Sequence, residues 1–94
     1  MICLAVHLLV KAGHEEDVKQ NFATLAPLSR KEPGCRLYIA HQSIQNPRRF
    51  LVYEQYDDQA ALDVHRKSEH FRQYATEGLY QHVESREADL YSPL

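Results

Sequence analysis

Two of the six histidines, His65 and His70, have the surroundings that best suit acid–base chemistry. An imidazole titrates near neutral pH, so either side chain could remove a proton from a phenolic or enolic hydroxyl group. His65 shares a helical stripe with Ala61 and Leu62, and this stripe is expected to face the protein core. The alternative is that His65 is a hydrogen-bonded core histidine and that His70 only begins a helical segment. Both histidines are therefore candidate catalytic residues, and the sequence does not choose between them.

Aromatic side chains that could bind an aromatic substrate occur close to these histidines in the sequence. Tyr56 is the favoured one, because it ends a predicted strand near the expected cleft, and Glu54 lies on the same face of that strand. A buried carboxylate is costly unless it is paired, so Glu54 is expected to orient a neighbour or to line a wet pocket. A salt bridge across a dimer is the alternative for Glu54, and core packing is the alternative for the tyrosines. The candidate substrate-binding residues are Tyr56, Glu54, Phe71, Tyr74 and His7.

Metal and nucleotide sites are not expected from the spacing of the residues that could build them. His65 and His70 are spaced i, i+5, which on one unbroken helix separates them by about 140°. No HExxH sequence is present, and the three glycines cannot form a GxGxxG or P-loop motif. The sequence also indicates no catalytic arrangement of the Ser-His-Asp or Cys-His type. The sequence therefore predicts a protein without a metal, flavin, haem or nucleotide cofactor.

Length and charge restrict the fold and the partners. The 94 residues fit a single domain, residues 1–94. Eleven Lys and Arg against thirteen Asp and Glu give a net charge of −2, so no basic field is available for nucleic acid or an anionic membrane. The longest apolar stretch is too short to span a bilayer, and His7 interrupts it. A histidine in such an apolar strand is most often a satisfied core residue. The N-terminal residues fit a strand better than a secretory leader, so a cytoplasmic location is expected. Cys3 and Cys35 are expected to be free, half-buried thiols.

The hydrophobic pattern predicts the elements that must position these side chains. Alternating residues predict strands over Met1–Lys11, Cys35–Ile44, Arg49–Tyr56 and Val83–Tyr91. The first of these is apolar on both faces, which is typical of a central strand covered on both sides. Helical spacing predicts a first helix from about Glu15 to Lys31, and a second that begins after Asp57 or Asp58 and ends near Gly78. Ser68 resembles a new N-cap, so the second helix is expected to break and restart there.

This β-α-β-β-α-β order is that of the ferredoxin-like α+β fold with an antiparallel sheet. Right-handed crossovers place the strands in the order fourth, first, third, second. The first and second strands are then about 9.6 Å apart, which excludes a disulfide between Cys3 and Cys35. Both helices lie on one face of such a sheet, yet the first three strands are apolar on both faces. Because monomers rarely expose so much apolar surface, two chains are expected to pair face to face as a homodimer.

Three segments together resemble the antibiotic biosynthesis monooxygenase (ABM) family, including its quinol monooxygenase branch. They are Val10–Glu15 (VKAGHE), Lys31–Cys35 (KEPGC) and Arg49–Phe71 (RFLVYEQYDDQAALDVHRKSEHF). The resemblance covers nearly the whole chain and implies a dimeric α/β barrel with a ligand cleft between the helices and the sheet of each subunit. For some members it also implies oxidation of quinols or polycyclic phenols by O₂ without metal or flavin.

The same superfamily contains proteins that degrade haem and proteins that isomerise a phosphorylated sugar, so the fold alone does not decide the reaction. Tyr56 stands where many family members have Trp. The Asn of the haem-degrading branch is missing from the first strand, since the first Asn is Asn21 in the predicted helix, which argues against haem degradation.

The sequence favours a cofactor-independent monooxygenase that oxidises a quinol or similar electron-rich aromatic with O₂. One alternative is a non-oxidative isomerase of a small carbonyl compound, with or without a phosphate group, in which the same histidines would move protons. The other is a non-catalytic dimer that binds a small apolar ligand. Uptake of O₂ distinguishes the first function from the other two.

Overall fold

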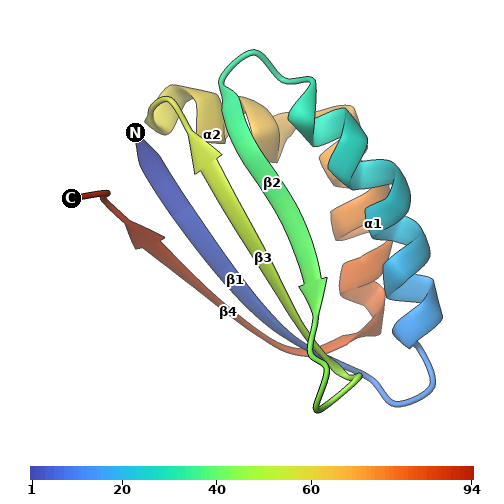
Figure 1. Cartoon of the computed structure of the whole chain (residues 1–94). Coiled ribbons are helices and arrows are strands. Elements are labelled where there is room, and N and C mark those ends of the chain that lie inside the picture. The colour runs from blue at the N-terminus through green and yellow to red at the C-terminus, as the bar shows by residue number, and fades with distance from the viewer.

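The computed structural model describes all residues from Met1 to Leu94 and contains the predicted β-α-β-β-α-β order (Figure 1). The strands are β1 (Ile2–Val10), β2 (Cys35–Gln42), β3 (Arg49–Tyr56) and β4 (Val83–Tyr91). The helices are α1 (Glu15–Arg30) and α2 (Gln59–Lys67), and after α2 come a π-helical segment η1 (Phe71–Thr76) and a short 3-10 turn η2 (Leu79–His82). The predicted ferredoxin-like fold class is confirmed. No helix has the length and apolarity needed to cross a lipid bilayer.

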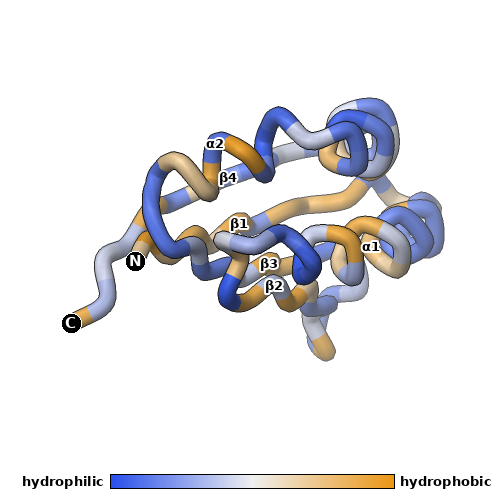
Figure 2. The backbone as a smooth tube through the Cα atoms, turned by 90° about the horizontal axis from the view of Figure 1, so that it is seen from above, coloured by the Kyte–Doolittle hydropathy of each residue, from blue (hydrophilic) through white to orange (hydrophobic).

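The antiparallel sheet has the strand order β2-β3-β1-β4, as right-handed crossovers predict. β1 pairs with both β3 and β4, so Leu4 lies between Glu54 and Leu90. β1 is almost continuously apolar, whereas the edge strand β4 is largely hydrophilic (Figure 2). Cys3 and Cys35 are both free thiols, and β3 separates their strands, in agreement with the prediction that no disulfide joins them.

One face of the sheet packs against the helices and forms the core. Alternate residues of β3, from Phe50 to Tyr56, are buried on this face, as the sequence predicts. The buried hydrophobic residues that the helical segments contribute are Val18, Phe22, Leu25, Ala26, Leu62, Ala75 and Leu79. α2 crosses the end of the sheet where β3 stops at Tyr56, and η1 then packs against α1 (Figure 1).

The ends of the elements follow local hydrogen bonds. β2 stops at Gln42, before the predicted Ile44, because the turn to β3 has already begun. In that turn the Ser43 hydroxyl accepts hydrogen bonds from the backbone N–H groups of Gln45 (3.2 Å) and Asn46 (3.1 Å). At the start of α2, the side chain of Asp58 accepts a hydrogen bond from the N–H of Ala61 (2.8 Å), so Asp58 is the cap of the two that were predicted.

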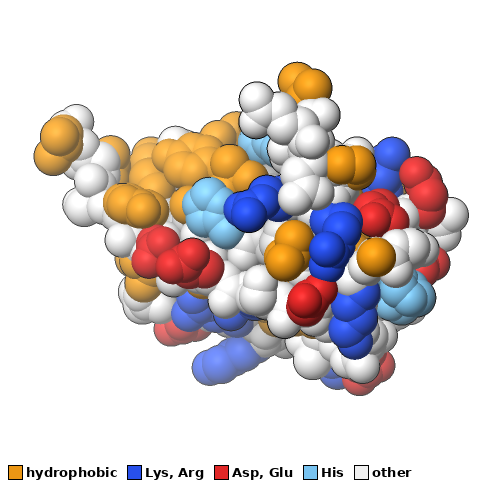
Figure 3. Space-filling model, turned by 90° about the horizontal axis from the view of Figure 1, so that it is seen from below, with side chains coloured by type: hydrophobic (Ala, Val, Ile, Leu, Met, Phe, Trp, Pro, Cys, Tyr) orange, Lys and Arg blue, Asp and Glu red, His pale blue; other side chains and the backbone are white.

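The opposite face of the sheet carries no helix (Figure 1). The prediction that β1 is covered on both sides is therefore wrong for the single chain, in which His7 is exposed and Leu9 only half-buried. Hydrophobic side chains gather over part of the surface seen from below, beside a histidine and a basic side chain (Figure 3). The apolar and aromatic residues whose register places them on the uncovered face are Cys3, Ala5, Leu9, Leu37, Ile39, Leu51, Tyr53 and Tyr91. We call this surface the free sheet face. Its exposed apolar residues favour pairing with a second chain, and that homodimer stays a prediction.

Candidate functional site

The break between α2 and η1 decides where the two candidate histidines point. Ser68 has an extended backbone (φ −69°, ψ 152°) and ends α2, as the sequence predicts. Its hydroxyl group accepts a hydrogen bond from the N–H of Phe71 (3.1 Å) and donates one to the carbonyl oxygen of His65 (2.7 Å). The chain changes direction here, so the separation that one continuous helix would impose on His65 and His70 does not apply. Both imidazoles instead reach the carboxylate group of Glu32.

Glu32 lies in the turn between α1 and β2 and joins the two histidines. Its Oε2 atom accepts hydrogen bonds from Nδ1 of His65 (2.9 Å) and from Nε2 of His70 (2.5 Å). Its side chain is 9% exposed, and its other oxygen, Oε1, is buried without a hydrogen-bond partner. Burial raises the pKa of Glu32, but the hydrogen bonds from His65 and His70 and their Coulombic attraction together hold this pKa below its usual value. Glu32 is therefore a buried carboxylate that accepts from both imidazoles.

His65 has the geometry of a general base. Its side chain is 2% exposed, and the carboxylate acceptor at Nδ1 assigns the ring proton to that nitrogen. Nε2 is then free to take up a proton, and it faces the carboxylate of Glu54 at 3.7 Å. A carboxylate that holds the far nitrogen of an imidazole fixes its tautomer and stabilises the imidazolium that forms. His70 is one-fifth exposed and directs its Nε2 at Glu32, so the geometry favours His65 over His70 as the base.

Glu54 and Tyr56 form a second buried polar pair, on the face of β3 that the alternation of the strand predicts. The Tyr56 hydroxyl donates a hydrogen bond to Oε1 of Glu54 (2.5 Å). Burial raises the pKa of Glu54, although the Tyr56 hydrogen bond and the nearby His65 act in the opposite direction. Burial and then the neighbouring Glu54 charge raise the pKa of Tyr56, so the phenol keeps its proton at neutral pH. Glu54 is therefore paired with Tyr56 of its own chain, which is the arrangement expected of a buried carboxylate that orients a neighbour.

Aromatic rings enclose His65 on several sides. The ring centroids of Tyr38, Tyr56 and Phe71 lie 5.7, 5.3 and 5.2 Å from the centroid of His65. Sequence reasoning identified Tyr56 and Phe71 but missed Tyr38, because a tyrosine that alternates along a strand gives no signal beyond strand packing. It also missed Glu32, which is 33 positions away from His65. Only the topology, which brings the α1–β2 turn beside α2, could have indicated Glu32.

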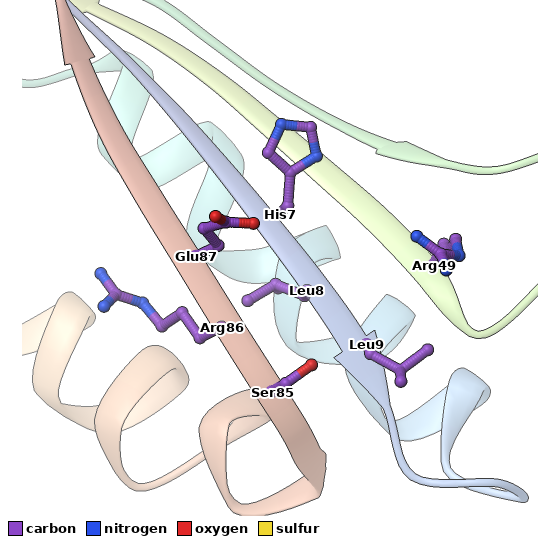
Figure 4. Close-up of a pocket in the computed structure, with 7 residues that line it drawn as sticks. All are labelled: His7, Leu8, Leu9, Arg49, Ser85, Arg86 and Glu87. Carbon is purple, nitrogen blue, oxygen red and sulfur yellow. The ribbon is translucent and has the colours of Figure 1, made fainter.

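Two of the predicted substrate-binding residues lie outside this cluster. Tyr74, on η1, is partly buried and packs against the edge of the core. His7 is exposed on the free sheet face, so it is not the satisfied core histidine that its apolar strand indicates. There it projects from β1 with Arg49 on one side and Glu87 on the other, at a shallow hollow of about 380 Å³ (Figure 4). The sheet separates this hollow from His65.

No surface hollow of the chain reaches the histidine cluster. All four hollows are lined by residues outside it, mainly on the free sheet face and along α1 and β2. η1 is π-helical, a geometry that occurs frequently at functional sites, and it follows directly after the break at Ser68.

Cys35, at the start of β2, does not add a nucleophile to this site. Burial raises the pKa of its thiol to about 11, and the charges of Glu32 and Glu54 act in the same direction. The thiolate, which is the reactive form, is then a minor species at neutral pH.

Gly34 allows the Glu32 turn to approach α2 closely. A Cβ atom at position 34 would lie 2.4 Å from the Cβ of Ala61, far inside van der Waals contact. Gly34→Ala is therefore expected to lower the free energy of unfolding by about 1–3 kcal/mol, as measured by urea denaturation. The double variant Gly34→Ala/Ala61→Gly removes the clash and should recover all but the ~1 kcal/mol that a glycine costs in a helix. A single variant as stable as the parent would contradict this close approach.

One protein family model matches residues 1–77, which is most of the chain, and it describes antibiotic biosynthesis monooxygenases. The chain belongs to the antibiotic biosynthesis monooxygenase family. Among ABM-like relatives, the Bacillus subtilis (strain 168) protein named "Putative monooxygenase YcnE" is 27% identical over 78 residues, which are 83% of this chain and 82% of YcnE. The resemblance drawn from the three sequence segments is thereby confirmed, and family membership supports a monooxygenase-like role.

Solved structures are similar over the whole chain. The crystal structure of PA3566 from Pseudomonas aeruginosa has a TM-score of 0.92 and 29% identity, and the match covers 99% of this chain and 93% of PA3566. A crystal structure of an antibiotic biosynthesis monooxygenase has a TM-score of 0.93 and 24% identity, and the match covers 100% of this chain and 99% of the other. At that identity the second likeness supports the ABM fold alone.

Proposed function

We propose that this ABM protein is a cofactor-independent monooxygenase that oxidises a quinol or a similar electron-rich aromatic with O₂. The observation that supports this function best is the buried His65, whose Nδ1–H donates to Glu32 while aromatic rings surround the imidazole. A substrate ring that entered here would stack against Tyr56 or Phe71 with its hydroxyl group near Nε2 of His65.

The chemistry needs a base and an electron-rich ring. His65 takes the proton of a substrate hydroxyl group at Nε2, and Glu32 stabilises the imidazolium that forms. The resulting anion reduces O₂ far more readily than the neutral quinol does. A quinol and O₂ then give a hydroxyquinone and water, so the substrate supplies all the electrons and no separate reductant is consumed. The hydroxyl of Tyr56 and the carboxyl of Glu54 are the remaining buried groups that can hydrogen-bond the substrate oxygens.

An oxygen electrode tests this proposal with the protein and a panel of quinols. We expect O₂ uptake that depends on both protein and quinol, that exceeds autoxidation of the quinol alone, and that persists after dialysis against a chelator. Binding of the aromatic compound without O₂ uptake would contradict the proposal and favour the binding protein. Conversion of a carbonyl compound without O₂ uptake would favour the isomerase.

A further inference from the structure

The free sheet face carries charged residues as well as apolar ones, and the register of the sheet separates them by sign. Glu87 and Asp89 lie on the edge strand β4, where Glu87 pairs with His7 of β1. Arg49 begins β3, on the other side of His7 (Figure 4). His41 of β2 lies next to β3, in the same row of the sheet as His7. The acidic residues therefore follow one edge of this face, and the basic Arg49 and the imidazole of His41 lie toward the opposite edge.

Arg49, Glu87 and Asp89 are exposed, and none of the ion pairs of the chain includes them. By contrast, the neighbouring Arg48 pairs with Glu84. An unpaired charge costs little while it stays in water, but it is strongly destabilising when an interface buries it without a partner. The apolar residues of the same face favour burial against a second chain. Both requirements are met together only if the charges of one chain meet opposite charges of the other.

The positions of these charges distinguish two ways in which the sheets of two chains can stack. A two-fold axis that crosses the strands lays β4 of one chain on β4 of the other, so that the acidic residues of both chains face each other. An axis that runs along the strands instead lays β4 over the edge formed by β2 and β3, where Arg49 and His41 lie. Like charges across an interface cost affinity, whereas opposite charges fix the register. The charge pattern therefore selects the second arrangement.

We propose that two chains pair through their free sheet faces about an axis along the strands, with Glu87 of each chain bound to Arg49 of the partner subunit. The two-fold symmetry makes two such ion pairs in one dimer. This inference adds to the predicted homodimer the direction in which the chains face each other, and it gives the charges of an otherwise apolar face a function. It does not depend on the proposed oxidation, because the sheet lies between this face and His65.

Charge reversal on separate chains tests this pairing directly. Arg49→Glu gives a chain with acidic groups at both positions, and Glu87→Arg gives a chain with basic groups at both. Each variant alone places like charges at both pairs of its homodimer, so its dissociation constant should rise by about 10²–10⁴-fold. An equimolar mixture of the two regains both pairs in a heterodimer. Sedimentation equilibrium of a fluorescently labelled variant should therefore show a shift toward monomer for that variant alone, and a dimer once the other variant is added unlabelled.

The chain offers a matched control for the reversal of a charge on the sheet. Arg86 neighbours Glu87 on β4 but pairs in register with the buried Leu8, and its guanidinium group lies 5.3 Å from the ring centroid of Tyr80. Arg86→Glu therefore changes the same charge on the helix-covered face, and its dimer should be as stable as that of the parent. The double variant Arg49→Glu/Glu87→Arg restores opposite charges at both pairs and should also dimerise like the parent.

Three results would overturn the proposal. A mixture that stays monomeric while the double variant dimerises would place the ion pair within one chain. Single variants that dimerise as strongly as the parent would show that the chains meet in another orientation or that a different partner occupies the face. A monomeric parent would exclude the dimer itself. If circular dichroism shows that a single variant does not fold alone, the two variants are co-expressed, and failure to recover a folded heterodimer then contradicts the pairing.

Discussion

His65→Gln is expected to lower the turnover of a quinol substrate by about 10²–10⁴-fold, which corresponds to about 3–5 kcal/mol of activation free energy. The physical reason is that an amide cannot take up the substrate proton that Nε2 of His65 accepts. Glutamine keeps much of the volume of the imidazole, and its NH₂ group can still donate to Oε2 of Glu32, so the melting temperature should change little. Initial rates of O₂ uptake at saturating quinol, with thermal unfolding of the same preparation, measure both quantities.

The comparison with His70→Gln separates the two candidate bases. His70 contacts the same oxygen of Glu32 but is one-fifth exposed, so its loss should affect turnover less than the loss of His65. The reverse order would assign the base to His70. If both variants oxidise the quinol as fast as the parent, neither histidine is the base, and a protein that only binds a small apolar ligand becomes the better interpretation.

The chain is expected to sediment at about twice its own mass of 11.0 kDa at micromolar concentration. The free sheet face carries Ile39, Leu51 and Tyr53 side by side on adjacent strands, and no helix of the same chain covers them. Two such faces packed about a two-fold axis remove this apolar area from water. Sedimentation equilibrium measures the mass directly, and a folded, soluble monomer at this concentration would exclude an obligate dimer.

Leu51→Asp is expected to dissociate the dimer, because it buries an unpaired carboxylate in the interface. Leaving such a charge uncompensated costs about 3–5 kcal/mol, which raises the dissociation constant by about 10²–10⁴. Thr24→Asp adds the same charge to the exposed surface of α1, away from the free sheet face, and serves as the control. If Leu51→Asp and Thr24→Asp sediment alike as dimers, the chains do not associate through this face.

The amino-acid sequence by itself determined the structural features that depend on residues close together in the chain. The alternation of β3 places Phe50, Glu54 and Tyr56 on one face, because successive strand residues point to opposite sides whatever the strand packs against. The cap at Asp58 and the break at Ser68 follow from side-chain hydrogen bonds to N–H groups only three residues away. The strand order follows in turn from the order of the elements and the handedness of their crossovers.

Contacts between distant residues were decided only by the tertiary structure. In the sequence Glu32 is one glutamate before a Pro-Gly turn, and nothing local distinguishes it from a surface residue. It becomes the common acceptor of His65 and His70 because the α1–β2 turn packs against α2 without a side chain at Gly34. Likewise His7 has the same apolar neighbours in the sequence as a core histidine. It is exposed because both helices cover the other face of the sheet, and which face they cover depends on crossover handedness and packing rather than on the residues next to it.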